Sequence, residues 1–470
     1  MSQIGAIALL AVRGAVRSRV VAALYVLLLA AAVLFPSAIR SDGTADGFVR
    51  LHLTYSLGLA SFLLGLASLW AGADSVSREA DDKTIQLLLV KPVPRRNVWL
   101  GKWLGILAID AILLALAGSA VAISLRIHLL RGGFDPDSLA HARLAALSSL
   151  ESFRSPLPDV EPLVRAECAQ LLSRGILPAD APMEDVAAAV RNNLLAKSFS
   201  VPPGESLSWS FDLPPADRPA PLLVRFRCDS SIPGASDVRA SVSLEWDGLR
   251  QTVERLALPG TVQTVAFDVS SARAGRAVVS FANLAERPVT LFFDPADGLV
   301  LRRARGSFAA NFARSLALVF FRLALFAAVG VSLGTLFSMP VAAFLSLVLV
   351  LVLQLSGFVA AAAKTDRNAF VANVASIGHG HSHAPAPEAE PSPAARALAS
   401  ATFYAYRATY IALAPLIDFR AVDDVASAVR IPPRQVLAEA LRQGILFPAF
   451  LAAASTAVLR RREWALPGGS

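Results

Sequence analysis

The chain has 470 residues, of which 55% are hydrophobic and only 17% are charged. Soluble domains average about 45–50% apolar and about 25% charged residues, so this composition excludes an ordinary soluble protein and a disordered one. The net charge is +8, and two cysteines are too few for a disulfide-dense scaffold. We therefore expect a membrane protein.

Six stretches are apolar enough to be transmembrane helices. At 1.5 Å per residue, about 20 residues cross a hydrocarbon core of about 30 Å. The uncharged run 323–363 is about twice that length, and Ser338-Met339-Pro340 near its middle predicts a turn between two helices. The expected spans are 20–39, 51–73, 103–125, 315–337, 340–363 and 438–459.

Basic residues beside the spans predict which side faces the cytoplasm. They cluster before the first span, between the second and third spans, and after the last span. If the chain has six spans, all three clusters lie on the same side of the membrane. Both termini are therefore predicted to be cytoplasmic. The basic character of the chain reflects this orientation rather than nucleic-acid binding. The residues are Arg13, Arg17, Arg19, Arg78, Lys83, Lys91, Arg95, Arg96, Lys102, Arg460, Arg461 and Arg462.

Residues 1–19 are predicted to form a short amphipathic helix on the cytoplasmic surface. The alternative is a cleaved signal peptide. The basic region is long, however, and no small-x-small site closes the apolar run, so we expect the first helix to be retained.

Residues 127–305 form the largest segment outside the spans, and the topology places them outside the cytoplasm. Their first part, 139–198, is expected to be helical, with helices near 139–153, 160–173 and 183–198. From 199 to 305, apolar and polar residues alternate, which predicts a β-sandwich or jelly roll. The expected strands are 206–213, 222–229, 238–246, 251–256, 262–268, 277–283 and 289–293.

Two questions about this domain stay open in the sequence. It is either a module that binds carbohydrate, lipid or a partner protein, or a structural spacer, and no aromatic cluster marks a sugar platform. Cys168 and Cys228 both lie in it, and their spacing does not decide between a disulfide and two free thiols.

The segment 364–437 is a second extracytoplasmic stretch in this topology. It contains His379, His381 and His383 in a Pro- and Ala-rich part that is expected to be a flexible loop. Alternating imidazoles coordinate zinc, copper or nickel, but no fourth ligand is evident, so we expect weak, adventitious binding rather than a resident metal. Residues 409–417 are too short to span and are expected to form a re-entrant or surface helix interrupted at Pro415.

Asp110 and Arg322 are charged residues inside predicted spans, where ionisable groups are candidates for function. Their depths differ by about 12 Å, too far for an easy direct pair, so a structural role for Asp110 competes with gating or coupling. Small residues also form a stripe along the second span, which allows close helix packing; a subunit interface or a pathway lining is the alternative. The stripe is Gly58, Ser61, Gly65, Ser68 and Gly72.

The loop 74–102 is predicted to be cytosolic. Residues 77–89 favour a short helix, because acids occupy its first turn and Pro92 and Pro94 end it. A compact amphipathic element between two spans suits the docking of a cytosolic partner; the alternative is a plain connection. The chain contains no G-x-x-x-x-G-K-[ST], H-E-x-x-H or G-x-S-x-G motif, so we expect no catalytic activity of its own.

This loop resembles the cytosolic loop of permeases of type-2 ABC transporters. Gly330–Ser338 at the turn after the fourth span and Arg460–Glu463 after the last span resemble the same family. Lys83 stands where the family commonly has glycine, a mild departure, and the 127–305 domain is an insertion outside the resemblance. The matching loop residues are Glu79, Lys83-Thr84, Leu87-Leu88-Leu89, Pro92, Arg95-Arg96 and Gly101-Lys102.

The resemblance implies a permease subunit of the bacterial inner membrane that pairs with an identical or different second permease. Two separate cytosolic ATPase subunits would dock on it and use the ATP, while this chain binds no cofactor. Most of the family exports lipids, glycans, drugs or peptides, and some members serve protein assembly or metal-cofactor maturation. The outer domain suggests handling or gating of a substrate, or a periplasmic partner, and membrane lipid surrounds the spans. The expected contacts with the ATPase are Arg78, Glu79, Asp81, Asp82, Lys83 and Thr84.

Two other classes of protein remain. A membrane-anchored receptor or glycan-binding protein would display the β-domain, but it would need neither the patterned loop nor the small-residue stripe. A metal-ion transporter would use His379, His381 and His383 for capture, but it would want more intramembrane ligands than Asp110.

Overall fold

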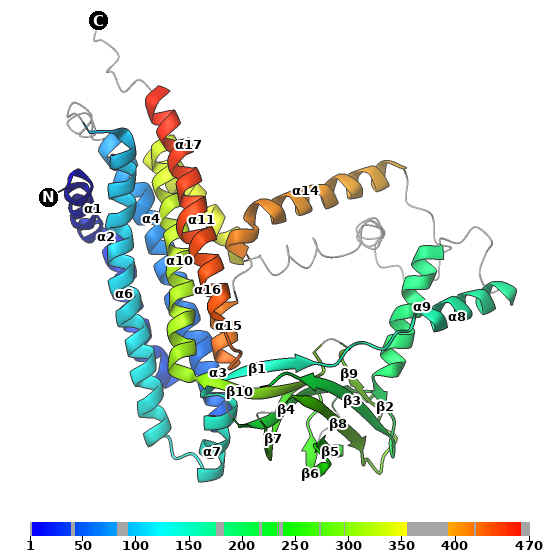
Figure 1. The fold of residues 1–470 in the computed structure, drawn as a ribbon. Helices are drawn as coiled ribbons and strands as arrows, with labels where there is room; N and C mark the ends of the chain where they lie inside the picture. The colour runs from blue at the N-terminus through cyan, green and yellow to red at the C-terminus, as the bar shows by residue number, and fades with distance from the viewer. Residues whose placement is uncertain are drawn as a thin grey trace, which may run out of the picture.

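A bundle of long helices stands on a β-rich domain in the computed structural model (Figure 1). We call the end of the bundle where α4 (Gly58–Asp81) ends and α6 (Arg95–Arg131) begins the loop end, and the end that carries the strands the domain end. The helix α1 (Gln3–Arg17) and the last turns of α17 (Phe447–Arg461) lie toward the loop end. The structure describes residues 2–38, 43–81, 93–174, 183–215, 219–232, 234, 238–271, 274–295, 297–354, 393–417 and 420–461.

Four helices of the described part are long and apolar enough to cross a membrane. Two more helices, α2 (Arg19–Ala38) and α11 (Met339–Gln354), lie where the first and fifth spans are expected, so the number six stays a prediction. The four are 45–79, made of α3 (Ala45–His52), the π-helical η1 (Leu53–Leu57) and α4; α6; α10 (Phe308–Leu336); and 433–458, made of α16 (Pro433–Leu441), η2 (Arg442–Leu446) and α17.

The N-terminal helix α1 packs against the beginning of α6. The Ser2 hydroxyl caps α1 by accepting a hydrogen bond from the Gly5 amide at 3.2 Å. On α6, a Cβ at Gly101 would lie 2.7 Å from Ile7, and a Cβ at Gly105 would lie 2.8 Å from Ala11. The two glycines are one turn apart, so they leave a flat strip of backbone on which α1 rests.

The helices α4 and α10 approach each other even more closely. A Cβ at Gly72 would lie 2.8 Å from the backbone nitrogen of Val331. On the facing helix, a Cβ at Gly330 or Gly334 would clash with backbone atoms of α4 at Leu69 and Ala73. Glycine on both sides therefore lets the two backbones touch, which is how helices gain packing energy in lipid.

The β-rich domain consists of two sheets that share one apolar core. One sheet has the order β1-β10-β4-β9-β2, with β7 beside β4, and the other has the order β3-β8-β5-β6. Phe226 and Phe281, from different sheets, meet in the core with ring centroids 5.4 Å apart. The strands are β1 (Ser148–Arg154), β2 (Ser200–Val201), β3 (Ser206–Leu213), β4 (Ala220–Ser230), β5 (Val238–Trp246), β6 (Leu249–Ala257), β7 (Val262–Ser271), β8 (Gly275–Asn283), β9 (Leu291–Phe293) and β10 (Leu299–Ser307).

The β-rich character predicted for residues 199–305 is confirmed. The first and last strands of the domain, however, differ from the prediction. The helix expected near 139–153 ends as α7 (Pro136–Ala145), and Ser148–Arg154 is strand β1. Strand β10 was not predicted, and β1 pairs with it antiparallel. Because the partner of β1 lies about 150 residues away in the chain, its local sequence alone did not show the pairing.

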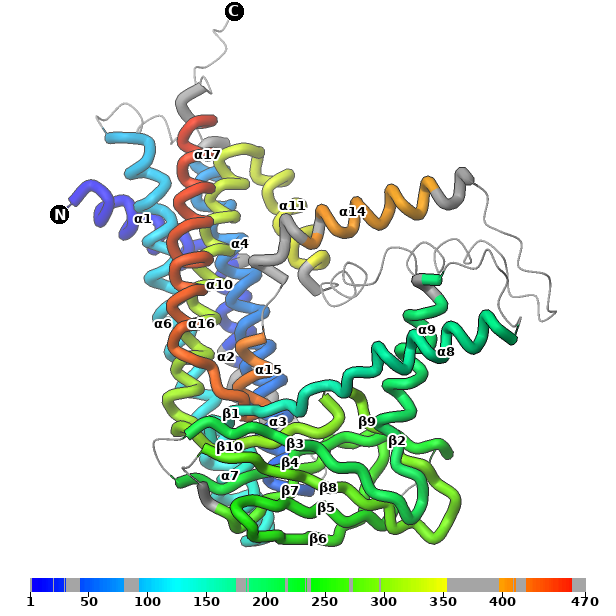
Figure 2. The backbone as a smooth tube through the Cα atoms, turned by 45° about the vertical axis from the view of Figure 1, so that its right-hand side comes forward, coloured from blue at the N-terminus to red at the C-terminus, as the bar shows by residue number. Residues whose placement is uncertain are grey.

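Strand β10 leads directly into α10. The Ser307 side chain caps this helix by accepting a hydrogen bond from the Ala310 amide at 3.3 Å. Two helices close to those predicted, α8 (Glu161–Ser173) and α9 (Met183–Ser198), stand away from the sheets (Figure 2). Cys168 and Cys228 are both buried and free, so the structure has two thiols rather than a disulfide.

The helix α14 (Pro393–Ile417) projects from the bundle in both views (Figures 1 and 2). It continues past Pro415, so the predicted interruption there is wrong. After α15 (Ala421–Ala426), the chain crosses the junction between strands and helices, where the Leu150 amide donates to Ala428 O at 2.8 Å and Asn311 Nδ2 donates to Val429 O at 2.8 Å. This segment therefore ties β1 to α10.

We expect Gly330→Ala to lower the thermal stability of the detergent-solubilised protein, because the added Cβ overpacks the α4–α10 contact at a cost of about 1–3 kcal/mol. Gly14→Ala is the matched control: a Cβ there meets nothing within 4 Å, and alanine favours the helix. Equal melting temperatures for the two variants would contradict the close packing of α4 and α10.

Candidate functional site

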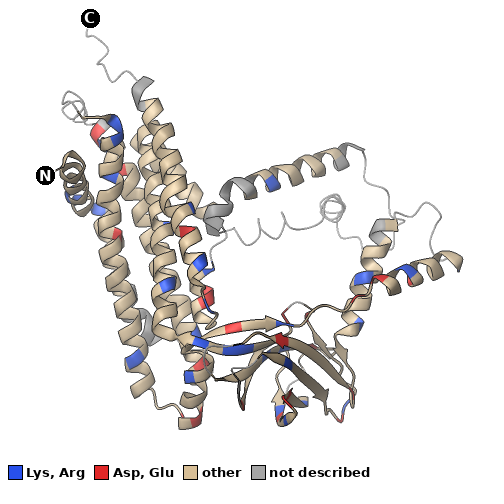
Figure 3. Cartoon of the chain, viewed as in Figure 1, with Lys and Arg blue, Asp and Glu red and all other residues tan. Residues whose placement is uncertain are grey.

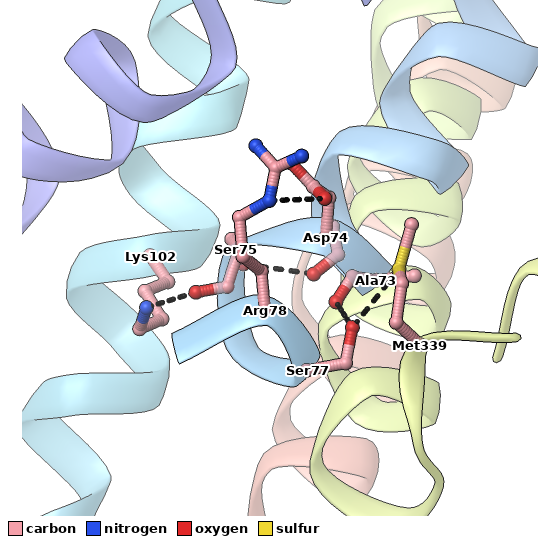
Figure 4. A network of polar contacts seen from close by, with 8 residues as sticks. Ala73, Asp74, Ser75, Ser77, Arg78, Lys102 and Met339 are labelled. Carbon is pink, nitrogen blue, oxygen red and sulfur yellow. Dashed lines mark hydrogen bonds and ion pairs between the residues drawn. The ribbon is translucent and has the colours of Figure 1, made fainter. Parts of the chain in front are cut away.

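A buried lysine joins α4 and α6 at the loop end. The Nζ of Lys102 on α6 lies 2.7 Å from Oε2 of Glu79 on α4, and it also donates a hydrogen bond to the Ser75 carbonyl. The Lys102 side chain is 3% exposed and that of Glu79 is 36% exposed. Figure 4 shows Lys102 reaching across to α4. The pair thus connects the two ends of the predicted coupling loop.

The last turns of α4 also contact α11. Ser77 Oγ donates to Ala73 O at 2.7 Å and lies 3.2 Å from Sδ of Met339, the first residue of α11 (Figure 4). Arg78 Nε lies 3.6 Å from Asp74 Oδ1 on the outer side of the same turn. The loop end of α4 therefore contacts α6 through Lys102 and the α10–α11 turn through Met339.

Only part of the predicted ATPase contact set lies in the described residues. Arg78 is 58% exposed, and Glu79 shares its carboxylate with Lys102. Asp81 is the last residue of α4, while Asp82, Lys83 and Thr84 lie outside the described residues. Their role in docking stays a prediction. Lys102 was not among the predicted contact residues. It belongs to the Gly101-Lys102 motif, but the sequence did not indicate which residue it pairs with.

The small-residue stripe on α4 divides into two parts. Toward the loop end, Gly72 packs on the α10 backbone. Toward the domain end, Gly58, Ser61 and Gly65 line a cavity of about 210 Å³ together with Arg322. Internal packing is therefore observed along the stripe, and it includes Gly65, where a Cβ would lie 2.8 Å from Phe326 of α10. A subunit interface or a pathway lining, the alternatives from the sequence, stay predictions.

The two charged residues inside the spans have separate surroundings. Asp110 is completely buried, and its Oδ2 accepts a hydrogen bond from Ser68 of the stripe at 2.8 Å. Arg322 places its guanidinium over the Phe326 ring, 5.3 Å from the centroid. The structure thus joins Asp110 to Ser68, two candidates that the sequence treated independently.

A larger cavity, of about 820 Å³, lies at the domain end and is lined by many arginines that sequence analysis did not single out. One signal was present. Arg302, Arg303 and Arg305 directly precede α10 on the side that the predicted topology places outside the cytoplasm, where basic residues are normally depleted. His379, His381 and His383 lie outside the described residues, and within the described part no cluster of three His, Cys, Asp or Glu forms a metal site.

One acid of this cavity has a shifted pKa. Burial raises the pKa of Asp424 to about 6; the Arg420 guanidinium opposes the shift, and the Asp423 carboxylate adds to it. Its charged form is therefore less favourable in the folded protein than in the unfolded chain.

Comparison with known families identifies the first part of the chain. Residues 6–147 match the model of the ABC-2 family transporter protein. The resemblance to type-2 ABC permeases is confirmed over these residues. The match covers α1, α4 and α6, and so includes the Lys102–Glu79 pair of the permease, but it stops before β1. No curated protein and no solved structure matches the chain.

We expect Glu79→Gln to destabilise the permease by about 1–3 kcal/mol, because it leaves the buried Lys102 ammonium without its carboxylate. Arg78→Gln is the matched control, since the Arg78 side chain is largely exposed and its 3.6 Å contact with Asp74 is a weaker ion pair, worth about 0–1 kcal/mol. Thermal unfolding in detergent measures both. An equal loss in the two variants would show that Lys102 does not depend on Glu79.

We expect Asp424→Asn to change how stability depends on pH. The folded pKa of about 6 lies above the usual 3.8, so wild type loses stability relative to the variant as pH rises from about 4 to about 6. Below about 4 both side chains are neutral, and above about 6 the difference stays constant. Melting temperatures measured between pH 4 and 8 test this, and parallel curves would refute it.

Proposed function

We propose that this chain is the membrane subunit of an ABC exporter that pairs with a second permease subunit in a bacterial inner membrane. Separate ATPase subunits dock from the cytosol on residues 78–84 and drive the movement of a substrate across the membrane. The supporting observation is the Lys102–Glu79 pair, which lies within the segment that matches the ABC-2 family. This pair joins α4 to α6, the two helices on either side of the predicted cytosolic loop.

The contacts along α4 suggest how motion would pass through the protein. A push on the loop end moves α4 and α6 together, since Lys102 holds them. The glycine contacts at Gly72, Gly330 and Gly334 then carry the displacement to α10. Strand β10 leads directly into α10, and it pairs with β1, which follows α6 and α7 in the chain. The β-domain would therefore move with α6 and α10.

Export fits the position of the β-domain in the predicted topology. With the loop end in the cytosol, this domain lies on the outer side, where a released substrate arrives. Closure of the ATPases at one end of the bundle would therefore change the arrangement at the other end, about 55 Å away for a helix of the length of α6.

We expect an ATPase with a phosphate-binding loop to copurify with the tagged full-length protein and with the control Asp212→Arg/Asp268→Arg, which alters two exposed acids of the β-domain. Asp81→Arg/Asp82→Arg should lose it, because two reversed charges oppose docking. Mass spectrometry identifies the partner, and vanadate-sensitive ATP hydrolysis of the purified complex confirms that it is coupled.

Each result has a distinct meaning. An ATPase retained equally by all three proteins would keep the exporter but move the docking surface away from residues 81–82. No ATPase with wild type, under conditions that preserve membrane complexes, would contradict the exporter and favour a membrane-anchored receptor that displays the β-domain.

A further inference from the structure

The cavity at the domain end lies between the first sheet and the segment around α15. Strands β1, β4 and β10 form one wall, and the residues from Arg420 to Arg434 form the other. Its volume of about 820 Å³ is large enough for a small ligand. Charged positions are frequent on both walls at this junction (Figure 3).

The charges lining this cavity are unbalanced. It is lined by seven arginines and four carboxylates. Two arginines are neutralised: Arg154 lies 2.7 Å from Asp297, and Arg305 lies 3.0 Å from Glu151. Among the described residues, no ion pair forms at the other five, which are Arg225, Arg302, Arg420, Arg430 and Arg434.

Arg302 lies in the wall of the cavity and has a hydrogen-bond donor that no described residue accepts. Its strand pairs on both sides, with Ser152 of β1 and Leu223 of β4. The side chain is 5% exposed, its Nη1 donates to Ser427 O at 2.9 Å, and its buried Nε has no hydrogen-bond partner in the described structure. A buried donor without an acceptor destabilises the protein, and an anionic ligand in the cavity would supply the missing acceptor.

Neighbouring cations increase the positive potential at this wall. Burial, followed by repulsion from the guanidinium groups of Arg225 and Arg50, lowers the pKa of Arg302 to about 9, although Asp46 and Asp297 oppose the shift. The pKa of Arg225 is also lowered, first by burial and then by Arg50. Arg50, Arg225 and Arg302, from α3, β4 and β10, thus repel one another beside a cavity whose lining has more arginines than carboxylates.

We propose that this cavity binds the phosphate group of a ligand at the membrane surface of the β-domain. Planar guanidinium groups bind phosphate through paired hydrogen bonds, and several of them converge here from rigid strands and short helices. The site does not depend on transport: it follows from the cavity itself, and it would hold for a receptor as well as for an exporter.

The ligand has two chemical sources, a lipid headgroup or a soluble phosphate compound. Asp423 lines both this cavity and the 210 Å³ cavity inside the bundle, so the two adjoin at that residue. Apolar residues line most of the inner cavity, including Phe62, Leu66 and Val350. A phosphate in the basic cavity with a hydrocarbon chain directed inward would use both, so we expect the lipid to bind more tightly.

The test titrates the full-length protein in a neutral maltoside detergent with three probes: inorganic phosphate, short-chain phosphatidic acid and short-chain phosphatidylcholine. Arg302→Gln removes the buried donor, and Arg420→Gln/Arg434→Gln removes two exposed cations of the opposite wall that make no hydrogen bond through their side chains in the described structure. Arg276→Gln/Arg287→Gln is the control, with the same loss of charge on exposed arginines elsewhere in the domain.

We expect phosphatidic acid to bind wild type and the control equally, and both cavity variants at least about tenfold more weakly, since each variant loses charge-assisted hydrogen bonds to the phosphate. Binding of inorganic phosphate with the same variant pattern would support the site and assign it to a soluble ligand. If Arg302→Gln fails to fold, the variant Arg420→Gln/Arg434→Gln still tests the site, because both of its residues are exposed. Phosphatidylcholine also carries a phosphate, but its choline cation is repelled by the arginines, so we expect it to bind more weakly than phosphatidic acid. Absence of binding by inorganic phosphate and by phosphatidic acid, or equal affinity of phosphatidic acid for wild type and Arg420→Gln/Arg434→Gln, would overturn the proposal.

Discussion

The backbone contact between α4 and α10 is the constraint on which the rest of the structure depends. In lipid, helices gain little from burying apolar side chains against each other, so close packing through small residues carries much of their association. Gly72, Gly330 and Gly334 bring the two backbones together. One of these helices leads to the loop end through Glu79, and the other begins at the β-domain, so this contact joins the two ends of the protein.

The β-domain is attached to the bundle as a continuation of its helices. β10 becomes α10 at Ser307, and β1 follows α6 after the short helix α7. Because β1 and β10 pair with each other, the helices on either side of the β-domain are held at a fixed separation. The segment after α15 adds hydrogen bonds to both β1 and Asn311 of α10. A domain attached in this way transmits displacement, whereas a flexible linker would absorb it.

Basic residues serve two purposes in this chain. Those near the loop end follow the pattern that orients membrane proteins, and Lys102 among them joins two helices. In the predicted topology, those at the domain end run against that pattern. Their concentration around one cavity, with Arg302 buried in its wall, is costly unless the cavity receives an anion. This exception to the charge rule is the reason for proposing a second site there.

Much of this architecture was determined by the sequence alone. Period-two alternation predicted β3 and β5 with the bounds observed, and helical periodicity did the same for α9, because local burial patterns set those elements. The loop motif also predicted the family that residues 6–147 match.

Only the tertiary structure decided the rest. Pairing with a distant partner turned Ser148–Arg154 into a strand, and the surrounding helices divided one stripe of small residues between packing and a cavity. Lys102 pairs with Glu79, and arginines far apart in the chain line one cavity. These outcomes depend on which surfaces meet in three dimensions, and a local pattern of residues does not contain that information.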